Sequence, residues 1–143
     1  MGRPLAPLRE LSRVRCLELL ATTDLGRVGA SLRALPVILP VRYAVAGENV
    51  VFRTAPGSKL TAATRRAVVA FEADRSDPGG AWGWSVLVQG VAFEVSDPAL
   101  QAAARALLAH DLPFLDGEVA RLVAIEIAVV SGRAFGAVPG DTA

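Results

Sequence analysis

Residues 51–60 read Val-Phe-Arg-Thr-Ala-Pro-Gly-Ser-Lys-Leu, and they combine a strand, a turn and the start of a helix. The first four residues favour a strand, Pro-Gly lets the chain reverse, and Ser58 is a typical helix N-cap. Side chains that donate hydrogen bonds or carry positive charge follow one another here: Arg53, Thr54, Ser58 and Lys59. Such donors around a tight turn suit a phosphate group, because hydrogen bonds to a charged partner contribute roughly 1.5 to 3 kcal/mol each. The same residues also fit a capped turn with a solvated lysine, and their chemistry alone favours neither interpretation.

The sequence on both sides of this stretch predicts a mainly β protein with short helices. Runs of β-branched and apolar residues predict six strands, at 26–32, 37–45, 50–54, 67–73, 82–95 and 119–130. Cap signals and periodicity predict short helices at 12–21, 59–66 and 99–110. Because most strands are joined by short turns, the sheet should be antiparallel, and closure into a small six-stranded barrel leaves the fewest open faces. Gln89-Gly90 is predicted to form a bulge or a bend in the longest strand.

The composition predicts one domain covering residues 1–143, with a short frayed tail after Val138. The 143 residues are 52% hydrophobic, which suffices for a sizeable core. The single cysteine, Cys16, excludes an intrachain disulfide and a zinc or dithiol cluster, and it is compatible with a cytoplasmic protein. A net charge of +1 argues against nucleic acid as a partner, and no apolar run approaches the ~20 residues of a membrane span. The apolar excess suggests that a second subunit covers part of the surface.

Side chains for acid–base, nucleophilic or metal chemistry are sparse in this sequence. The one histidine, His110, is predicted near a helix end, and no GxSxG motif is present. The carboxylates of the predicted strands are assigned to different strands, which gives no acid–base pair: Glu72, Asp74, Glu94 and Glu126. No catalytic residue and no metal site are therefore assigned.

Two tryptophans begin the longest predicted strand. Trp82 and Trp84 have the same parity as Val86 and Val88, so all four should face one side of the sheet. Flanked by glycine, the tryptophans can form a wall for a planar aromatic ligand. They fit equally well in the core or at a dimer interface.

Taken together, these segments resemble the pyridoxamine 5′-phosphate oxidase-like flavin-binding split-barrel family over about residues 10–136. The resemblance is carried by five segments: 26–28, 39–43, 52–60, 69–72 and 83–90. It implies a six-stranded antiparallel split β-barrel that forms a homodimer, with two flavin mononucleotides (FMN) at the subunit interface. The implied phosphate-binding residues are Arg53, Thr54, Ser58 and Lys59. The resemblance also implies a strand beneath the flavin ring at Pro40, Val41, Arg42 and Tyr43, and a contact from the long strand near Trp84 and Ser85.

The same resemblance implies an oxidoreductase that transfers a hydride between flavin N5 and a small substrate. A flavin needs no catalytic acid from the protein for this step, which agrees with the sparse catalytic side chains. In true pyridoxamine phosphate oxidases, a C-terminal segment with arginine and histidine helps to hold the substrate, and here only Arg133 follows Gly132. Alternatives are a deazaflavin-dependent reductase, or a non-catalytic binding or sensor protein for flavin, deazaflavin or haem. A small interaction domain that binds no cofactor is a third alternative.

Overall fold

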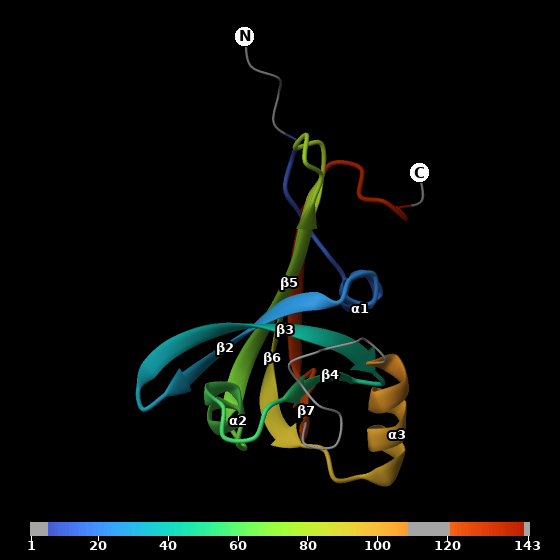
Figure 1. The fold of residues 1–143 in the computed structure, drawn as a ribbon. Helices are drawn as coiled ribbons and strands as arrows, with labels where there is room; N and C mark the ends of the chain where they lie inside the picture. The colour runs from blue at the N-terminus through green and yellow to red at the C-terminus, as the bar shows by residue number, and fades with distance from the viewer. Residues whose placement is uncertain (1–5, 109–120, 142–143) are drawn as a thin grey trace.

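The computed structural model describes residues 6–108 and 121–141, which form a mainly β protein built around a small barrel (Figure 1). The elements in chain order are β1 (Arg9–Glu10), α1 (Arg13–Leu20), β2 (Leu25–Leu32), β3 (Leu35–Ala46), β4 (Asn49–Thr54), α2 (Lys59–Ala63), β5 (Val68–Ser76), β6 (Gly83–Glu94), α3 (Pro98–Leu107), β7 (Arg121–Glu126) and β8 (Val129–Phe135). His110 and the connection predicted at 111–117 lie outside the described residues. None of the helices in the described ranges is long and apolar enough to cross a membrane.

Six of the strands close into a ring. Their order is β6-β5-β2-β3-β4-β7, and β7 pairs back with β6. Every neighbouring pair in the ring is antiparallel. The first half of β6 pairs instead with β8, which carries the two-residue strand β1 on its other side. The predicted six-stranded antiparallel split barrel is therefore confirmed, with β8 and β1 added beside the ring.

The last predicted strand, 119–130, is divided into β7 and β8 by a bulge. Ile125 of β7 pairs with Ala92 of β6, and Val129 of β8 pairs with Gln89. Between these two pairs the chain advances four residues from Ile125 to Val129 but only three residues from Gln89 to Ala92 on β6. One extra residue is accommodated between β7 and β8, which is the pattern of a β-bulge.

Gly90 lies on β6 opposite this bulge. It pairs with Val69, and the register between β5 and β6 runs one-to-one through it, so the extra residue is not at Gln89-Gly90 as predicted but on the facing strand. A β-carbon built on Gly90 would overlap the carbonyl oxygen of Glu126. Glycine is needed here because the bulged backbone passes directly over it.

The local signals for helix starts and for the hairpin turn are confirmed. The Ser12 hydroxyl accepts the N–H of Arg15 at 3.2 Å, and the Asp97 carboxylate accepts the N–H of Leu100 at 3.1 Å. Between β3 and β4, Gly47 adopts φ +60°, a conformation that favours glycine in a two-residue hairpin. These positions begin α1 and α3 and join β3 to β4, as the sequence predicts.

Two apolar cores lie on opposite sides of the barrel wall. The larger core fills the barrel and includes Phe52, Phe71 and Val88, all fully buried. A smaller core lies beneath α3 and includes Val51 and Ala104. Because neighbouring strand residues point to opposite faces, β4 contributes alternate side chains to the two cores.

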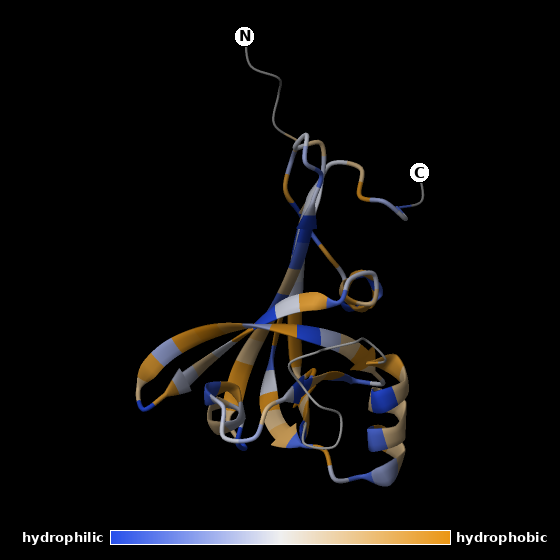
Figure 2. Ribbon diagram, viewed as in Figure 1, coloured by the Kyte–Doolittle hydropathy of each residue, from blue (hydrophilic) through white to orange (hydrophobic). Residues whose placement is uncertain are grey.

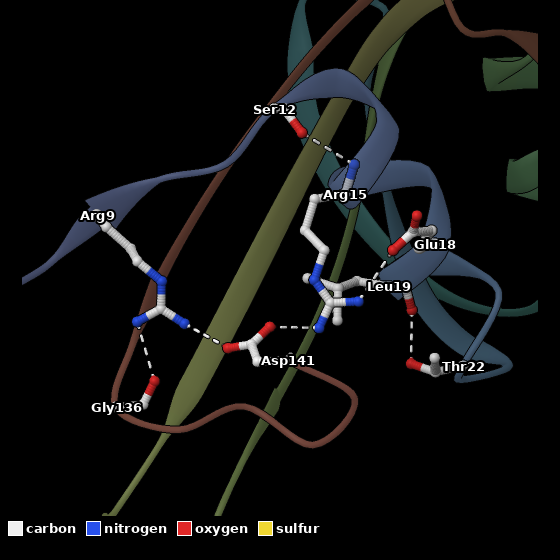
Figure 3. A network of polar contacts seen from close by, with 8 residues as sticks. All are labelled: Arg9, Ser12, Arg15, Glu18, Leu19, Thr22, Gly136 and Asp141. Carbon is white, nitrogen blue, oxygen red and sulfur yellow. Dashed lines mark hydrogen bonds and ion pairs between the residues drawn. The ribbon is translucent and has the colours of Figure 1, made fainter. Parts of the chain in front are cut away.

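The two ends of the described chain are joined by a polar network (Figure 3). The Asp141 carboxylate accepts hydrogen bonds from Arg9 at 2.8 Å and from Arg15 at 2.6 Å. Arg9 also donates to the carbonyl oxygen of Gly136 at 2.9 Å. The tail after Val138, predicted to be frayed, is thus held against β1 and α1 through Asp141.

The outer face of the sheet carries large apolar side chains that remain exposed. Val68 is 75% exposed, Ile38 73% and Val129 57%. In Figure 2 the apolar colour runs along the β2–β3 hairpin, which projects from the barrel. The apolar excess seen in the sequence is therefore partly concentrated on one face. The register aligns one row across five strands of this face, namely Val129, Gln89, Ala70, Gly29 and Ile38.

Candidate functional site

A chain of hydroxyl groups organises the loop between β4 and α2. Ser58 caps α2: its Oγ accepts the N–H of Thr61 at 3.1 Å and lies 3.1 Å from the Thr61 hydroxyl. The Thr61 hydroxyl lies 3.0 Å from the Thr54 hydroxyl and donates to the carbonyl oxygen of Ala55 at 2.7 Å. Two of the predicted phosphate-binding residues, Thr54 and Ser58, are thus brought together through Thr61, which the sequence reading did not single out. Thr54 is only 1% exposed, so its hydroxyl supports the loop from within.

The two predicted cations of this loop have no partner among the residues that the structure describes. Arg53 is half-buried at the end of β4, and Lys59 is exposed at the start of α2. Within the described ranges neither side chain makes a hydrogen bond or an ion pair. Thr54 shares the inward parity of Phe52, so Arg53 leaves the strand on the other face. Only the length of its side chain can bring the Arg53 guanidinium around the strand end toward Lys59.

The predicted ring-binding strand has an open edge beside this loop. β3 pairs with β2 through Arg42, whereas its pairing with β4 begins only at Tyr43. On the side away from β2, no strand of the described chain pairs with residues 35–42. Backbone groups along this edge are available to a ligand, although Pro40 has no N–H and offers only its carbonyl oxygen. Since β4 diverges from β3 after Phe52, the loop that follows Thr54 begins next to this edge.

The side chains of this strand are engaged within the protein. Tyr43 is buried, and its hydroxyl donates to the carbonyl oxygen of Leu20 at 2.6 Å. Burial, followed by the charges of Asp24 and Glu72, raises the pKa of Tyr43 far above its ordinary value. Its ring meets Phe71 edge-on at 4.7 Å. Tyr43 therefore acts as a donor that ties β3 to the end of α1, and a ligand at this strand meets the backbone.

On β3, side chains that point outward alternate with buried ones. Arg42 points outward and donates to the Asp24 carboxylate at 2.8 Å, whereas Val41 is 6% exposed and belongs to the barrel core. The Arg42 guanidinium is thus already paired. This leaves the backbone of Pro40, Val41 and Arg42 as the part of the strand that can bind a ring.

Trp84 and Ser85 lie away from the loop within one chain. Trp84 is 5% exposed and packs in the barrel core, with Trp82 against it, which fits the core alternative for the tryptophans. Ser85 is exposed on the opposite face and pairs with Asp74 of β5. In the sheet, β6 is separated from β3 by β5 and β2, a distance of about 14 Å at the usual strand spacing.

Sequence reasoning missed a cluster of charges on the outer face. β5 extends to Ser76, so Glu72 and Asp74 lie on the same strand and, two residues apart, on the same face rather than on different strands. Arg27 of β2, the register partner of Glu72, lies 3.4 Å from the Glu72 carboxylate and 3.5 Å from that of Asp74. Burial, together with the hydrogen bond and charge of Asp74, raises the pKa of Glu72 from 4.5 to about 7, against the opposing effect of Arg27. The i, i+2 spacing on one strand is the signal that would have found this pair.

This pair makes stability depend on pH. The folded chain keeps the Glu72 proton up to about pH 7, whereas the unfolded chain releases it near pH 4.5. The folded state therefore binds more protons between these values, and stability falls as pH rises through that range. We expect Glu72→Gln to flatten the decrease by on the order of 1 kcal/mol, a value reduced for solvent screening at this partly exposed site. Denaturant unfolding at pH 5, 6, 7 and 8 measures it, with Glu126→Gln as an exposed control. Equal pH slopes in wild type and Glu72→Gln would contradict the assignment.

Comparison with known proteins agrees with this architecture. The family model described as pyridoxamine 5′-phosphate oxidase matches residues 12–134. An uncharacterised protein of Mycobacterium tuberculosis is 42% identical over 128 residues, which cover 86% of this chain and 82% of the relative.

Two solved structures share the fold. One, described as an FAD binding protein from Mycobacterium smegmatis, is 34% identical, with a TM-score of 0.76 over 90% of this chain and 98% of that one. A second, described as an FAD-binding protein from Mesorhizobium loti, has a TM-score of 0.80 at 23% identity, covering 92% of this chain and 99% of that one. The match of the family model over most of the barrel, with the similarity of the mycobacterial relative, shows that this chain belongs to the pyridoxamine 5′-phosphate oxidase family.

Proposed function

We propose that this protein binds a flavin by its mononucleotide part, FMN, and is an oxidoreductase acting on a small substrate. The observation that carries the proposal is the open backbone edge of β3 beside a loop whose lysine has no partner among the described residues. A flavin presents the matching groups, a polar ring edge and a phosphate. The M. smegmatis relative, described as binding FAD, supports the same ligand class.

The residues present fit such a cofactor. The phosphate would be held by the Lys59 ammonium and the Ser58 hydroxyl, with the Arg53 guanidinium joining them once its side chain extends around the strand end. Thr54 acts through Thr61, because its hydroxyl is buried against it. The polar edge of the ring would be held by the backbone of residues 40–42. When bound, the flavin supplies hydride transfer at N5, and the protein orients it and excludes water.

We further propose that the protein acts as a homodimer with the flavin bound at the subunit interface. Trp84-Ser85 and the β3 edge lie on strands three positions apart in the ring of one chain, and a partner copy that supplies the second segment would bring both to one flavin. The exposed apolar side chains of the outer face support this arrangement, since burying them stabilises association by roughly 25 cal/mol per Å². A single buried thiol, Cys16, supports a reducing compartment, and we propose the cytoplasm.

Charges placed on this face should separate the subunits. We expect Ile38→Glu/Val68→Glu to raise the dimer dissociation constant at least about a hundredfold, because two carboxylates would be buried without partners. Sedimentation equilibrium measures this, with Val14→Glu as the control, since Val14 is 67% exposed on α1 away from this face. Unchanged association in the double variant would exclude the face as the interface.

The proposed function is tested by titrating the purified protein with FMN and following flavin fluorescence and absorption. Binding in the micromolar range or tighter is expected, and the absence of any change in the flavin spectrum would refute it. Steady-state reduction of the bound flavin by a nicotinamide cofactor, or of a deazaflavin in a parallel assay, supports an oxidoreductase. Flavin binding without reduction by any donor would favour the non-catalytic alternative.

A further inference from the structure

A cavity of about 860 Å³ lies beyond the loop between β4 and α2. Its walls come from the last residue of β4, from α2 and the residues that follow it, from the end of β6 and the residues that follow it, from α3 and from β7. Its volume falls in the range of small-molecule binding sites, roughly 300 to 1,000 Å³. None of the residues so far proposed to contact flavin, apart from the supporting Thr54, lines it.

The cavity is positively charged. Arg65, Arg66 and Arg121 line it, against the single carboxylate of Glu94. Arg121 donates to Glu94 at 3.0 Å, so this pair is neutral as a whole. Arg65 and Arg66 are exposed and, in the part of the chain that the structure describes, make no hydrogen bond or ion pair through their side chains. As far as residues 6–108 and 121–141 show, two guanidinium groups therefore remain available to an anion.

Two further polar side chains of the cavity wall are already engaged. The Thr64 hydroxyl donates to the carbonyl oxygen of Leu60 at 2.6 Å, and the Gln101 amide donates to that of Val95 at 3.1 Å. Because these groups are satisfied, selectivity for an anion comes from the two arginines. Phe93, which is partly buried, adds an aromatic surface on which a planar ring can stack.

The cavity adjoins the loop that we propose to hold the flavin phosphate, through residues on either side of that loop. Thr54 and Thr61 line it, and their hydroxyls lie 3.0 Å apart in the same chain of hydroxyls that includes Ser58. A ligand whose phosphate lies at Ser58 and Lys59 can therefore enter the cavity only if it continues beyond that phosphate. FMN ends at this phosphate, whereas flavin adenine dinucleotide (FAD) continues with a second phosphate and an adenosine.

We propose that this cavity binds the adenosine monophosphate half of a dinucleotide flavin, with Arg65 and Arg66 on its phosphate and Phe93 beside its adenine. The inference rests on the proposed flavin binding and deepens it, because it makes FAD the preferred ligand over FMN. It also gives a role to two arginines to which the sequence reading assigned none.

The test compares three ligands on the full chain by isothermal titration calorimetry: FAD, FMN and ADP. Wild type is expected to bind FAD at least about tenfold more tightly than FMN, and to bind ADP. Arg65→Ala/Arg66→Ala should weaken FAD and ADP at least about tenfold and leave FMN within twofold. Arg33→Ala/Arg105→Ala, which removes the same charge from exposed residues outside the cavity, should change none of the three. Arg66 has φ +44°, and alanine carries the same Cβ, so the substitution adds no new backbone conflict; Arg65→Ala alone avoids that position altogether.

The outcomes separate the two proposals. Equal affinities for FAD and FMN, or a double variant that loses FAD no more than the control does, would overturn the cavity assignment while flavin binding stands. If neither flavin binds, the proposed function fails. The cavity is then judged by ADP: binding that depends on Arg65 and Arg66 supports a free adenine nucleotide as the ligand, and no binding overturns the site.

Discussion

Replacing Gly90 by alanine is expected to lower the free energy of unfolding by about 3 kcal/mol or more, out of the roughly 5 to 15 kcal/mol typical of a domain. The added Cβ would overlap the carbonyl oxygen of Glu126 and lie 2.9 Å from its carbonyl carbon. These are backbone atoms, held by the pairing of β7 with β4 and β6, so they cannot move aside as a flexible side chain would. Thermal unfolding should show a decrease in Tm of roughly 10 °C.

Gly29 provides a matched control for this substitution. It also lies within a strand, β2, but a Cβ there would meet only Ala70, its Cβ at 3.7 Å and its carbonyl oxygen at 4.0 Å, which are ordinary van der Waals contacts. Gly29→Ala should therefore change the free energy of unfolding by less than about 1 kcal/mol, partly because alanine restricts the unfolded chain. An equal decrease in the free energy of unfolding in the two variants would mean that the backbone of Glu126 does not exclude a Cβ at position 90.

Removing the two cations of the β4–α2 loop is expected to reduce FMN affinity at least about a hundredfold in Arg53→Ala/Lys59→Ala, with Lys59→Ala alone costing roughly tenfold or more. Both groups lack a partner inside the described chain, so neither is needed to balance a carboxylate and the fold should be unaffected. Fluorescence titration with FMN measures the affinity, and the Tm of each variant verifies folding.

Lys59→Arg and the Arg33→Ala/Arg105→Ala pair serve as controls. The arginine variant keeps the charge and should recover most of the affinity, whereas the control pair should bind FMN as wild type does. If Arg53→Ala/Lys59→Ala bound FMN normally, this loop would not be the phosphate site.

The helix starts and the β3–β4 hairpin could be predicted because each depends on a few adjacent residues. A side-chain oxygen three residues before its N–H partner caps a helix by itself, as Ser12, Ser58 and Asp97 do. The turn at Gly47 likewise needs only a residue that tolerates positive φ.

The division between β7 and β8 could not be predicted from the sequence. The residues around Ile127 are apolar except for Glu126 and continue the strand pattern without glycine or proline, so nothing local marks a break. The break arises from contacts distant in the sequence, since the Ile127 N–H donates to the carbonyl oxygen of Glu48 at 2.9 Å and the bulge faces Gly90. Gly90 stood out in the sequence as an irregular position, but the sequence did not show that the facing bulge between β7 and β8 requires it.

For the site, the sequence indicated the residue types but not their directions. Thr54 and Ser58 are linked by a hydroxyl that belongs to Thr61, a residue that the sequence pattern did not indicate. Tyr43 and Trp84 point into the barrel because alternate side chains of each strand face its interior. Which alternate set faces inward is determined by closure of the ring, and the sequence of one strand does not show it. Arg65 and Arg66 line a cavity whose opposite walls come from β6, α3 and β7, far along the chain.

The network around Asp141 makes the described chain nearly circular. Arg9, at the start of the fold, is bound directly to Asp141, at its end. A short linker joining these ends would leave every strand in its place, and new termini could be opened at the exposed tip of the β2–β3 hairpin, at Arg33 and Ala34. The fold should therefore not depend on which residues form the two termini. Circular permutation then offers a way to attach a reporter at the hairpin tip.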